Sequence, residues 1–252
     1  MKSLLSSVVI VLASIRATAG LTYDIHTATS GAQSSEQKIH ATVDGRNVRL
    51  DFEQGDGLVF RNGAIAISRD GGNTLEVLDP EAKTYYEIDL GAVAPPGMME
   101  LLKLSNEKVS VKDNGDGGVI EGYPTHRMMI TAGADVAIGN MKTRLDVTME
   151  SWSTPKIPAE SAAFLQHRGG STGMPVLDKL IAAQNDSIKG FPLKQVTHVR
   201  MASGGKTTIE MTSTTSVSNV KEKPATASTF ALPPGFRKVP NPIERMMGTA
   251  GH

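Results

Sequence analysis

Apolar and polar residues alternate along much of this chain, and turn dipeptides such as Asp44-Gly45 and Asn62-Gly63 interrupt the alternation at short intervals. A period of two is typical of a β-strand with one buried and one solvated face. Strands of this kind pair antiparallel, because parallel strands are usually apolar on both faces. The pattern therefore predicts a mainly β protein, built as a meander of hairpins. Its apolar alternating positions include Leu50, Phe52, Leu145, Val147, Met149, Ile209 and Met211.

Short segments of helical periodicity interrupt the strands. We expect helices at residues 97–104, 158–165 and 174–189, the last of them with Gly190 just beyond its end. Each of the first and third helices has an apolar stripe that suits packing against a sheet. The helices are therefore expected to cover one face of the sheet. The stripe residues are Met98, Leu101, Leu102, Leu177, Leu180 and Ile181.

Residues 1–19 have the pattern of a secretory signal peptide. Lys2 supplies a positive start, residues 4–15 form an apolar run, and a small-x-small sequence ends at Ala19. The run is shorter than the roughly 18 apolar residues that a transmembrane helix needs. We expect cleavage between Ala19 and Gly20. The mature protein is then predicted to be exported to the periplasm or beyond, and to be soluble, with no integral membrane segment.

The charge balance and the cysteine content exclude several classes of function. The chain has 26 basic residues, 26 acidic residues and no cysteine. Removal of Lys2 and Arg16 with the leader leaves 24 basic residues and a net charge of −2. Such a chain has no long-range field to attract nucleic acid. Without thiols, disulfides, cysteine-ligated metal sites, thiol nucleophiles and a lipid anchor on cysteine are excluded.

No repeat, charge run or long linker divides residues 20–240, which predicts a single domain. Residues 241–252 lack periodicity and are predicted to form a flexible tail.

Motifs for catalysis and metal binding are incomplete. Residues 203–207 resemble the end of a phosphate-binding loop, but Arg200 stands where its first glycine belongs. Residues 113–118 resemble a calcium loop in composition, yet glycine occupies two ligand positions, so a hairpin turn is expected there. There is no Gly-x-Ser-x-Gly motif, and the histidines have no ligand spacing. We predict no catalytic residue, metal or cofactor; only a zinc site assembled from distant strands would escape this test.

Five segments spread along the chain carry a family resemblance: residues 44–51 (DGRNVRLD), 78–88 (LDPEAKTYYEI), 120–126 (IEGYPTH), 150–158 (ESWSTPKIP) and 230–236 (FALPPGF). Together they resemble a family of exported bacterial proteins, mostly of unknown function, related to the lipoprotein-carrier (LolA-like) fold. The resemblance implies a strongly curved antiparallel sheet, an unclosed half-barrel whose concave apolar face is covered by short helices. In the carriers that concavity holds acyl chains, and a strand arginine contacts the helical lid. Arg49 lies in the matching segment, but its alternation with Leu50 puts it on the opposite face.

Two functions follow from these observations. In the first, the protein is a non-enzymatic carrier of a lipid, an acyl chain or a lipoprotein, held in a groove lined by the alternating apolar residues and covered by the helical stripes named above. Burial of each methylene would contribute about 0.8 kcal/mol. In the second, the protein is a structural or interaction module of the cell envelope, with a solid core and no ligand cavity.

Overall fold

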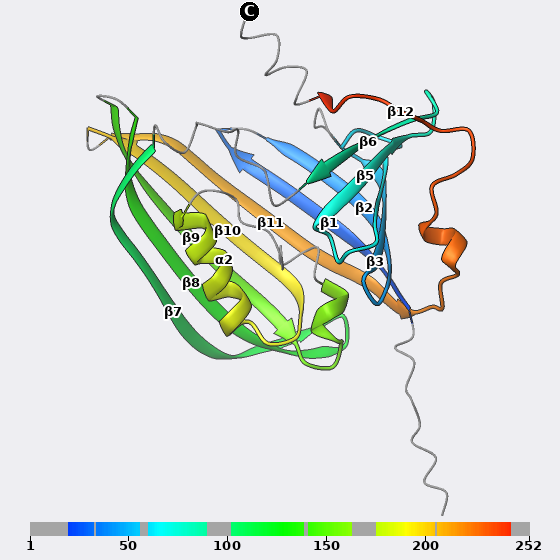
Figure 1. The fold of residues 1–252 in the computed structure, drawn as a ribbon. Helices are drawn as coiled ribbons and strands as arrows, with labels where there is room; N and C mark the ends of the chain where they lie inside the picture. Colours follow the sequence, from blue (N-terminus) through cyan, green and yellow to red (C-terminus); the bar gives the residue numbers. More distant parts are fainter. Residues whose placement is uncertain are drawn as a thin grey trace, which may run out of the picture.

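The computed structural model describes residues 20–32, 34–55, 60–89, 102–138, 141–162, 175–204 and 206–242 (Figure 1). Their strands form one sheet, in the order β12-β6-β5-β4-β3-β2-β1-β11-β10-β9-β8-β7. The bounds are β1 (Leu21–Gly31), β2 (Ser35–Asp44), β3 (Asn47–Gln54), β4 (Ile65–Ser68), β5 (Thr74–Asp79), β6 (Thr84–Asp89), β7 (Leu102–Ile120), β8 (Tyr123–Ile138), β9 (Met141–Thr154), β10 (Phe191–Ser203), β11 (Lys206–Glu222) and β12 (Arg237–Lys238).

Two antiparallel meanders make up this sheet, one from β1 to β6 and the other from β7 to β11. They join where β1 pairs antiparallel with β11, from Leu21 opposite Glu222 to Gly31 opposite Met211. The short strand β12 runs parallel to β6. The sheet is curved and stays open, with β12 and β7 at its two ends (Figure 1). This confirms the expected mainly β, unclosed antiparallel architecture.

The helix α2 (Pro175–Ser187) and the 3-10 helix η2 (Ala159–Ala162) lie on one face of the sheet, which we call the inner face and define by the side chains of Tyr23, Leu50 and Val147. Helix α2 packs against β8 and β7, and η2 packs against β10 (Figure 1). The bounds of α2 lie within the predicted helix at 174–189. Short helices thus cover parts of the inner face, as expected.

The outer face carries pairs of charged and polar side chains across neighbouring strands. Asp24 on β1 and His40 on β2 are register partners, and a carboxylate oxygen of Asp24 lies 2.7 Å from His40 Nδ1. Burial acts to raise the pKa of Asp24, but hydrogen bonds with His40 and Asn219 outweigh it and hold this pKa below its usual range. Pairs of charged and polar side chains are typical of a solvated face, which the alternation of the strands predicts for the outer side of the sheet.

The C-terminal segment covers part of the outer face. Phe230, the last residue of the 3-10 helix η3 (Ala227–Phe230), is buried and packs with Ile67 of β4 and Leu78 of β5. Arg69 Nε donates a 3.0 Å hydrogen bond to the carbonyl oxygen of Phe230. Leu232 and Phe236 pack against the same cluster. The motif at residues 230–236 therefore has a structural role in docking the C-terminal segment onto β4 and β5.

The predicted helix at 97–104 is wrong at its C-terminal end. Residues 97–101, with Met98 and Leu101, lie outside the described residues, but Leu102 begins β7 and pairs with Ile138 of β8. A short apolar run fits both the helical and the strand period. Pairing with β8 gives residues 102–104 inter-strand hydrogen bonds, and it decides between helix and strand.

The predicted hairpin turn at 113–118 is also wrong, because these residues lie within β7. The register with β8 shifts between Asp113 and Asp116 and again between Asp116 and Gly118. Gly115 and Gly118 have φ angles of +74° and +77°, and their N–H groups donate 2.8 Å hydrogen bonds to the carboxylates of Asp113 and Asp116. Turn-forming residues here produce bulges, which absorb extra residues without reversing the strand.

Candidate functional site

The register of the sheet places the predicted groove residues on the inner face. Pairing links Leu50 on β3, through β2, to Tyr23 on β1. It also links Met211 on β11, through Val199 on β10, to Val147 on β9. Because β1 pairs directly with β11, both rows belong to the same face. Alternation adds the other groove residues, which are Phe52, Leu145, Met149 and Ile209.

Five of these residues divide between two separate apolar clusters, and Ile209 and Met211 belong to neither. The first inner cluster contains Leu50 and Phe52, with exposed fractions of 0% and 2%. The second inner cluster contains Val147 and Met149, with Leu145 packed against it. The buried members of the first are Leu21, Tyr23, Ile25, Ile39, Ala41, Val43, Val48, Leu50, Phe52, Ala64, Ala66, Leu75, Val77, Ile88, Ile157, Ala162, Phe191, Leu193 and Val217. Those of the second are Met128, Ile130, Ala132, Ala134, Val147, Met149 and Ile188.

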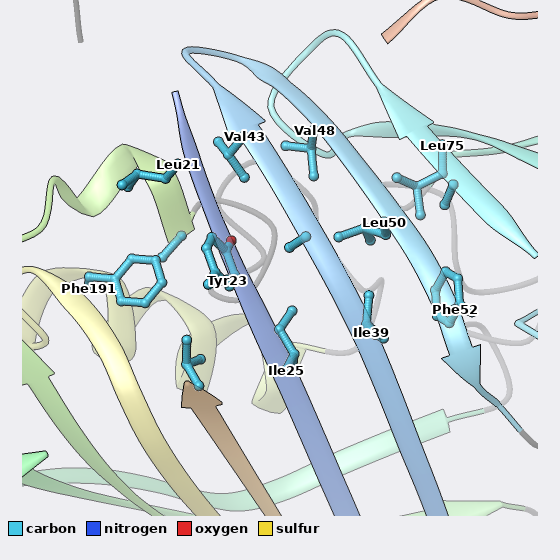
Figure 2. Packing of buried hydrophobic residues seen from close by; sticks show 14 of the residues in the cluster. Leu21, Tyr23, Ile25, Ile39, Val43, Val48, Leu50, Phe52, Leu75 and Phe191 are labelled. Carbon is cyan, nitrogen blue, oxygen red and sulfur yellow. The ribbon is translucent and has the colours of Figure 1, made fainter. Parts of the chain in front are cut away.

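The first inner cluster is closely packed (Figure 2). The rings of Tyr23 and Phe191 meet edge to face with their centroids 5.1 Å apart, and the rings of Phe52 and Phe60 stack at 4.8 Å. Both arrangements are favourable aromatic geometries. Complete burial raises the pKa of the Tyr23 phenol. Leu50 and Phe52 therefore belong to the solid core of the protein.

The second inner cluster has a less enclosed margin. Ala183 in α2 and Ile188, the residue after α2, pack on it. Leu145 and Val199, however, are only partly buried beside it, and Met211, opposite Val199, is half-buried too. Ile209, two residues from Met211 on the same strand, is 40% exposed. Apolar surface on the inner face thus continues past the part that is buried.

A band of polar side chains crosses the inner face between the two clusters. Pairing aligns Thr27 on β1, Thr215 on β11, Gln195 on β10 and Ser151 on β9 in one row. The hydroxyl oxygens of Thr27 and Thr215 are 3.0 Å apart. The next row of inward positions and the next inward position of β9 are polar as well. We call all these residues the polar band: Thr27, Thr29, Ser151, Ser153, Gln195, Thr197, Ser213 and Thr215. Sequence reasoning missed this band, although Ser213 and Thr215, in the Ser/Thr-rich residues 207–218, are polar at inward positions.

Two neighbouring atoms of the polar band have no hydrogen-bond partner in the described part of the chain. Ser151 Oγ is one of them, on a side chain that is 1% exposed, and Gln195 Nε2 is the other. Ser151 and Gln195 stand opposite each other in the register of β9 and β10. Ser153, by contrast, donates a 3.0 Å hydrogen bond to the carbonyl of Lys189. Buried polar groups without partners are rare, because each costs free energy.

The predicted lid residues do not all lie in helices of the described structure. Leu177, Leu180 and Ile181 belong to α2, and Ile181 is half-buried. Leu102 lies in β7 instead of a helix, and Met98 and Leu101 fall outside the described residues.

Arg49 points away from the inner face. Its Nη2 donates a 2.7 Å hydrogen bond to Asp51, and its Nη1 lies 3.4 Å from the carbonyl oxygen of Thr229 in η3. Arg49 therefore contacts the C-terminal segment on the outer face.

Across the ranges that the structure describes, no group of three or more histidine and acidic side chains gathers closely enough to hold a metal ion. No described helix has both the length and the apolar character needed to cross a membrane. The expected leader lies outside the described residues, as do residues 243–252 of the predicted tail. Gly20, the first described residue, is buried, and its carbonyl accepts a 2.7 Å hydrogen bond from Lys223 N.

Solved structures to which the chain is similar include a LolA superfamily protein from Nitrosomonas europaea. It has 8% identity and a TM-score of 0.34, with 85% of this chain and 90% of that chain covered. A domain from Vibrio parahaemolyticus, named for outer membrane lipoprotein sorting, has 11% identity, a TM-score of 0.33 and the same coverage. A DUF1329 family protein from Desulfovibrio piger has 8% identity and a TM-score of 0.33, with 86% of this chain and 90% of that chain covered.

No curated protein matches the chain. A family model matches residues 25–236, which is most of the chain and spans strands β1 to β11. The match confirms the expectation of a family without an established function. The protein belongs to the family described as Domain of unknown function (DUF4412).

Proposed function

We propose that the protein is exported and binds an apolar chain, either a lipid or the acyl chain of a lipoprotein, on the inner face of its sheet, without catalysing a reaction. The observation that carries this proposal is the incompletely covered margin of the second inner cluster. Val199, Met211 and Ile209 face the same side as the cluster but are only partly buried. An acyl chain laid over them would remove apolar surface from water.

The energetics of such binding need no polar contact. Each buried methylene contributes about 0.8 kcal/mol, so a long chain gains several kcal/mol from burial alone. Met128 and Met149 belong to the second inner cluster, and Met211 lies at its margin. Methionine side chains are flexible and adapt to apolar ligands of varied shape. The position of α2 over β8 and β7 supports a role as part of the cover.

The ligand is placed at the second inner cluster and not over Leu50 and Phe52. Those two side chains are already in contact with the packed interior of the first inner cluster and have exposed fractions of 0% and 2%. A chain bound there would have to displace core contacts. The proposed lining is therefore Leu145, Val147, Met149, Val199, Ile209 and Met211.

The first experiment is lipid extraction and mass spectrometry of protein purified from its native compartment. Stoichiometric lipid in the extract, absent from a control protein purified in parallel, supports the proposal. Adding a fatty acid or a lipopeptide to delipidated protein is expected to raise its melting temperature, because a ligand that binds the folded state stabilises it. Protein that carries no lipid and shows no thermal shift would refute the proposal.

A specific feature of the described sheet favours a second candidate, an interaction module of the cell envelope. Strand β7 ends the sheet, and its Val111 and Val119 are 43% and 71% exposed. An end strand has unpaired backbone groups that a partner strand can use. Delipidated protein that does not bind lipids but binds a partner protein through β7 would support this candidate. Cross-linking from a photoreactive residue introduced at position 119 tests it.

A further inference from the structure

We infer that Ser151 and Gln195 form a polar anchor for an ester carbonyl oxygen at the head of the bound acyl chain. The inference rests on the proposed function and adds to it the chemical class of the ligand. It follows from the position of these two side chains on the inner face and from the missing hydrogen-bond partners of their buried atoms.

The two side chains are neighbours with complementary capacities. Ser151 and Gln195 are register partners on adjacent antiparallel strands, so their Cβ atoms lie about 5 Å apart. Ser151 Oγ carries a hydroxyl donor, and Gln195 Nε2 carries amide donors; both atoms are buried without a hydrogen-bond partner in the described part of the structure. Two adjacent donors fit one oxygen acceptor. A buried donor that gains such a partner recovers a large part of its desolvation cost.

The surroundings say what else the ligand must contain. From Ser151, the inward positions of β9 run through Met149 and Val147 to Leu145, all in or against the second inner cluster. This stretch spans about 20 Å at roughly 3.3 Å per residue. In the other direction along β9, Ser153 is also polar, and its hydroxyl already donates a hydrogen bond to the backbone carbonyl of Lys189. The anchor therefore stands at one end of an apolar track, as the carbonyl stands at one end of an acyl chain.

The chemistry favours an uncharged acceptor. Ser151 is 1% exposed, and no described lysine or arginine contact is found at either unpartnered atom. A carboxylate or a phosphate at this depth would need a paired positive charge. An ester carbonyl needs only hydrogen bonds, which the two side chains can donate.

The test compares two lipids that differ in the carbonyl alone: monopalmitoylglycerol, an ester, and hexadecylglycerol, the ether without the carbonyl oxygen. Each displaces the fluorescent probe dansylaminoundecanoic acid from the delipidated full chain. The wild-type protein is expected to bind the ester about tenfold more tightly, because the ether leaves the buried donors unpaired. In the Ser151→Ala/Gln195→Met double variant the preference is expected to vanish, with affinity for the ether unchanged within about twofold.

Two controls accompany the double variant. Ser151→Ala alone is expected to keep the melting temperature of the wild type or raise it, because the hydroxyl has no partner to lose. Thr29→Val, in a band residue that already donates to Ser213, is expected to retain the ester preference.

The outcomes separate the inference from the proposed function. Equal wild-type affinity for the ester and the ether overturns the anchor and leaves acyl-chain binding intact. An ester preference that survives in the double variant also overturns the assignment to Ser151 and Gln195. If neither lipid displaces the probe, the anchor and the proposed function both fail.

Discussion

The hydroxyl of Tyr23 donates a 2.9 Å hydrogen bond to the carbonyl oxygen of Ser161. This bond joins the first strand of the sheet to η2, across 138 residues of sequence. The phenol is completely buried, and Ser161 is partly buried. It helps to hold η2 over the first inner cluster.

Tyr23→Phe is expected to lower the free energy of unfolding by about 1 kcal/mol, since it removes the hydrogen bond that the buried phenol donates to Ser161. The edge-to-face contact with Phe191 is retained, so the change isolates the hydroxyl. Urea unfolding followed by circular dichroism measures the effect. An unchanged midpoint and slope would mean that the bond contributes nothing to stability.

Met211→Asp is expected to reduce acyl-chain affinity by at least tenfold while the protein still folds, because a charge would then lie against the bound chain. Met211 is half-buried, so the folded state tolerates the carboxylate at its solvated side. Thr212→Asp is the matched control: it adds the same charge one position along β11, beside His198 on the outer face. Probe displacement by a fatty acid should weaken for Met211→Asp only. Equal affinities in the two variants would remove Met211 from the site.

Phe230→Ala is expected to destabilise the protein by about 3 kcal/mol through the cavity left against Ile67 and Leu78. The change lies on the outer face, so affinity for lipid per folded molecule should stay at the wild-type value. Chemical denaturation gives the first quantity and probe titration the second. A loss of affinity in fully folded Phe230→Ala would show that the two faces are coupled.

Acidification is expected to destabilise the protein partly through Asp70. Burial acts to raise the pKa of this carboxyl, but hydrogen bonds from Thr74, Ser68 and Asn73 outweigh it and hold the pKa below its usual range. A lowered pKa in the folded state gives stability that is complete above the unfolded-state pKa of about 3.9. That stability is lost as the pH falls from there through the lower folded-state pKa.

Thermal unfolding between pH 7 and pH 2 tests this expectation. Asp70→Asn should melt at a lower temperature than the wild type at pH 7. The difference should shrink as the pH falls below 4 and through the lowered folded-state pKa, because the wild-type carboxyl then takes up a proton and loses its charge. A constant difference across this range would assign the effect to shape instead of charge.

Local patterns predicted much of the fold. Val48, Leu50 and Phe52 alternate as the core face of β3 requires, and the apolar period at 174–189 matches α2. Prediction failed in β7, where Leu102 fits either period and where Asp-Gly chemistry serves bulges instead of a turn. In both cases pairing with β8 decides, and that pairing is not written in the local sequence.

The candidate site was less predictable than the fold. Alternation alone put Leu50 and Met149 on apolar strand faces, and the tertiary structure assigns them to different clusters. The polar band was not predicted, because a serine such as Ser151 is expected at a solvent-exposed position when its strand is considered alone. Its burial depends on neighbours that are distant in the sequence.

By itself, the sequence determined that this chain forms antiparallel strands with one apolar face, because the period of two is a local property of the backbone. The tertiary structure alone decided that β1 pairs with β11 and so where the two meanders join. That pairing aligns Thr27 with Thr215, and the pairing of β10 with β9 brings Gln195 opposite Ser151. The physical reason is that register between strands is set by the packing of the whole inner face, and it is register that places two buried donors side by side.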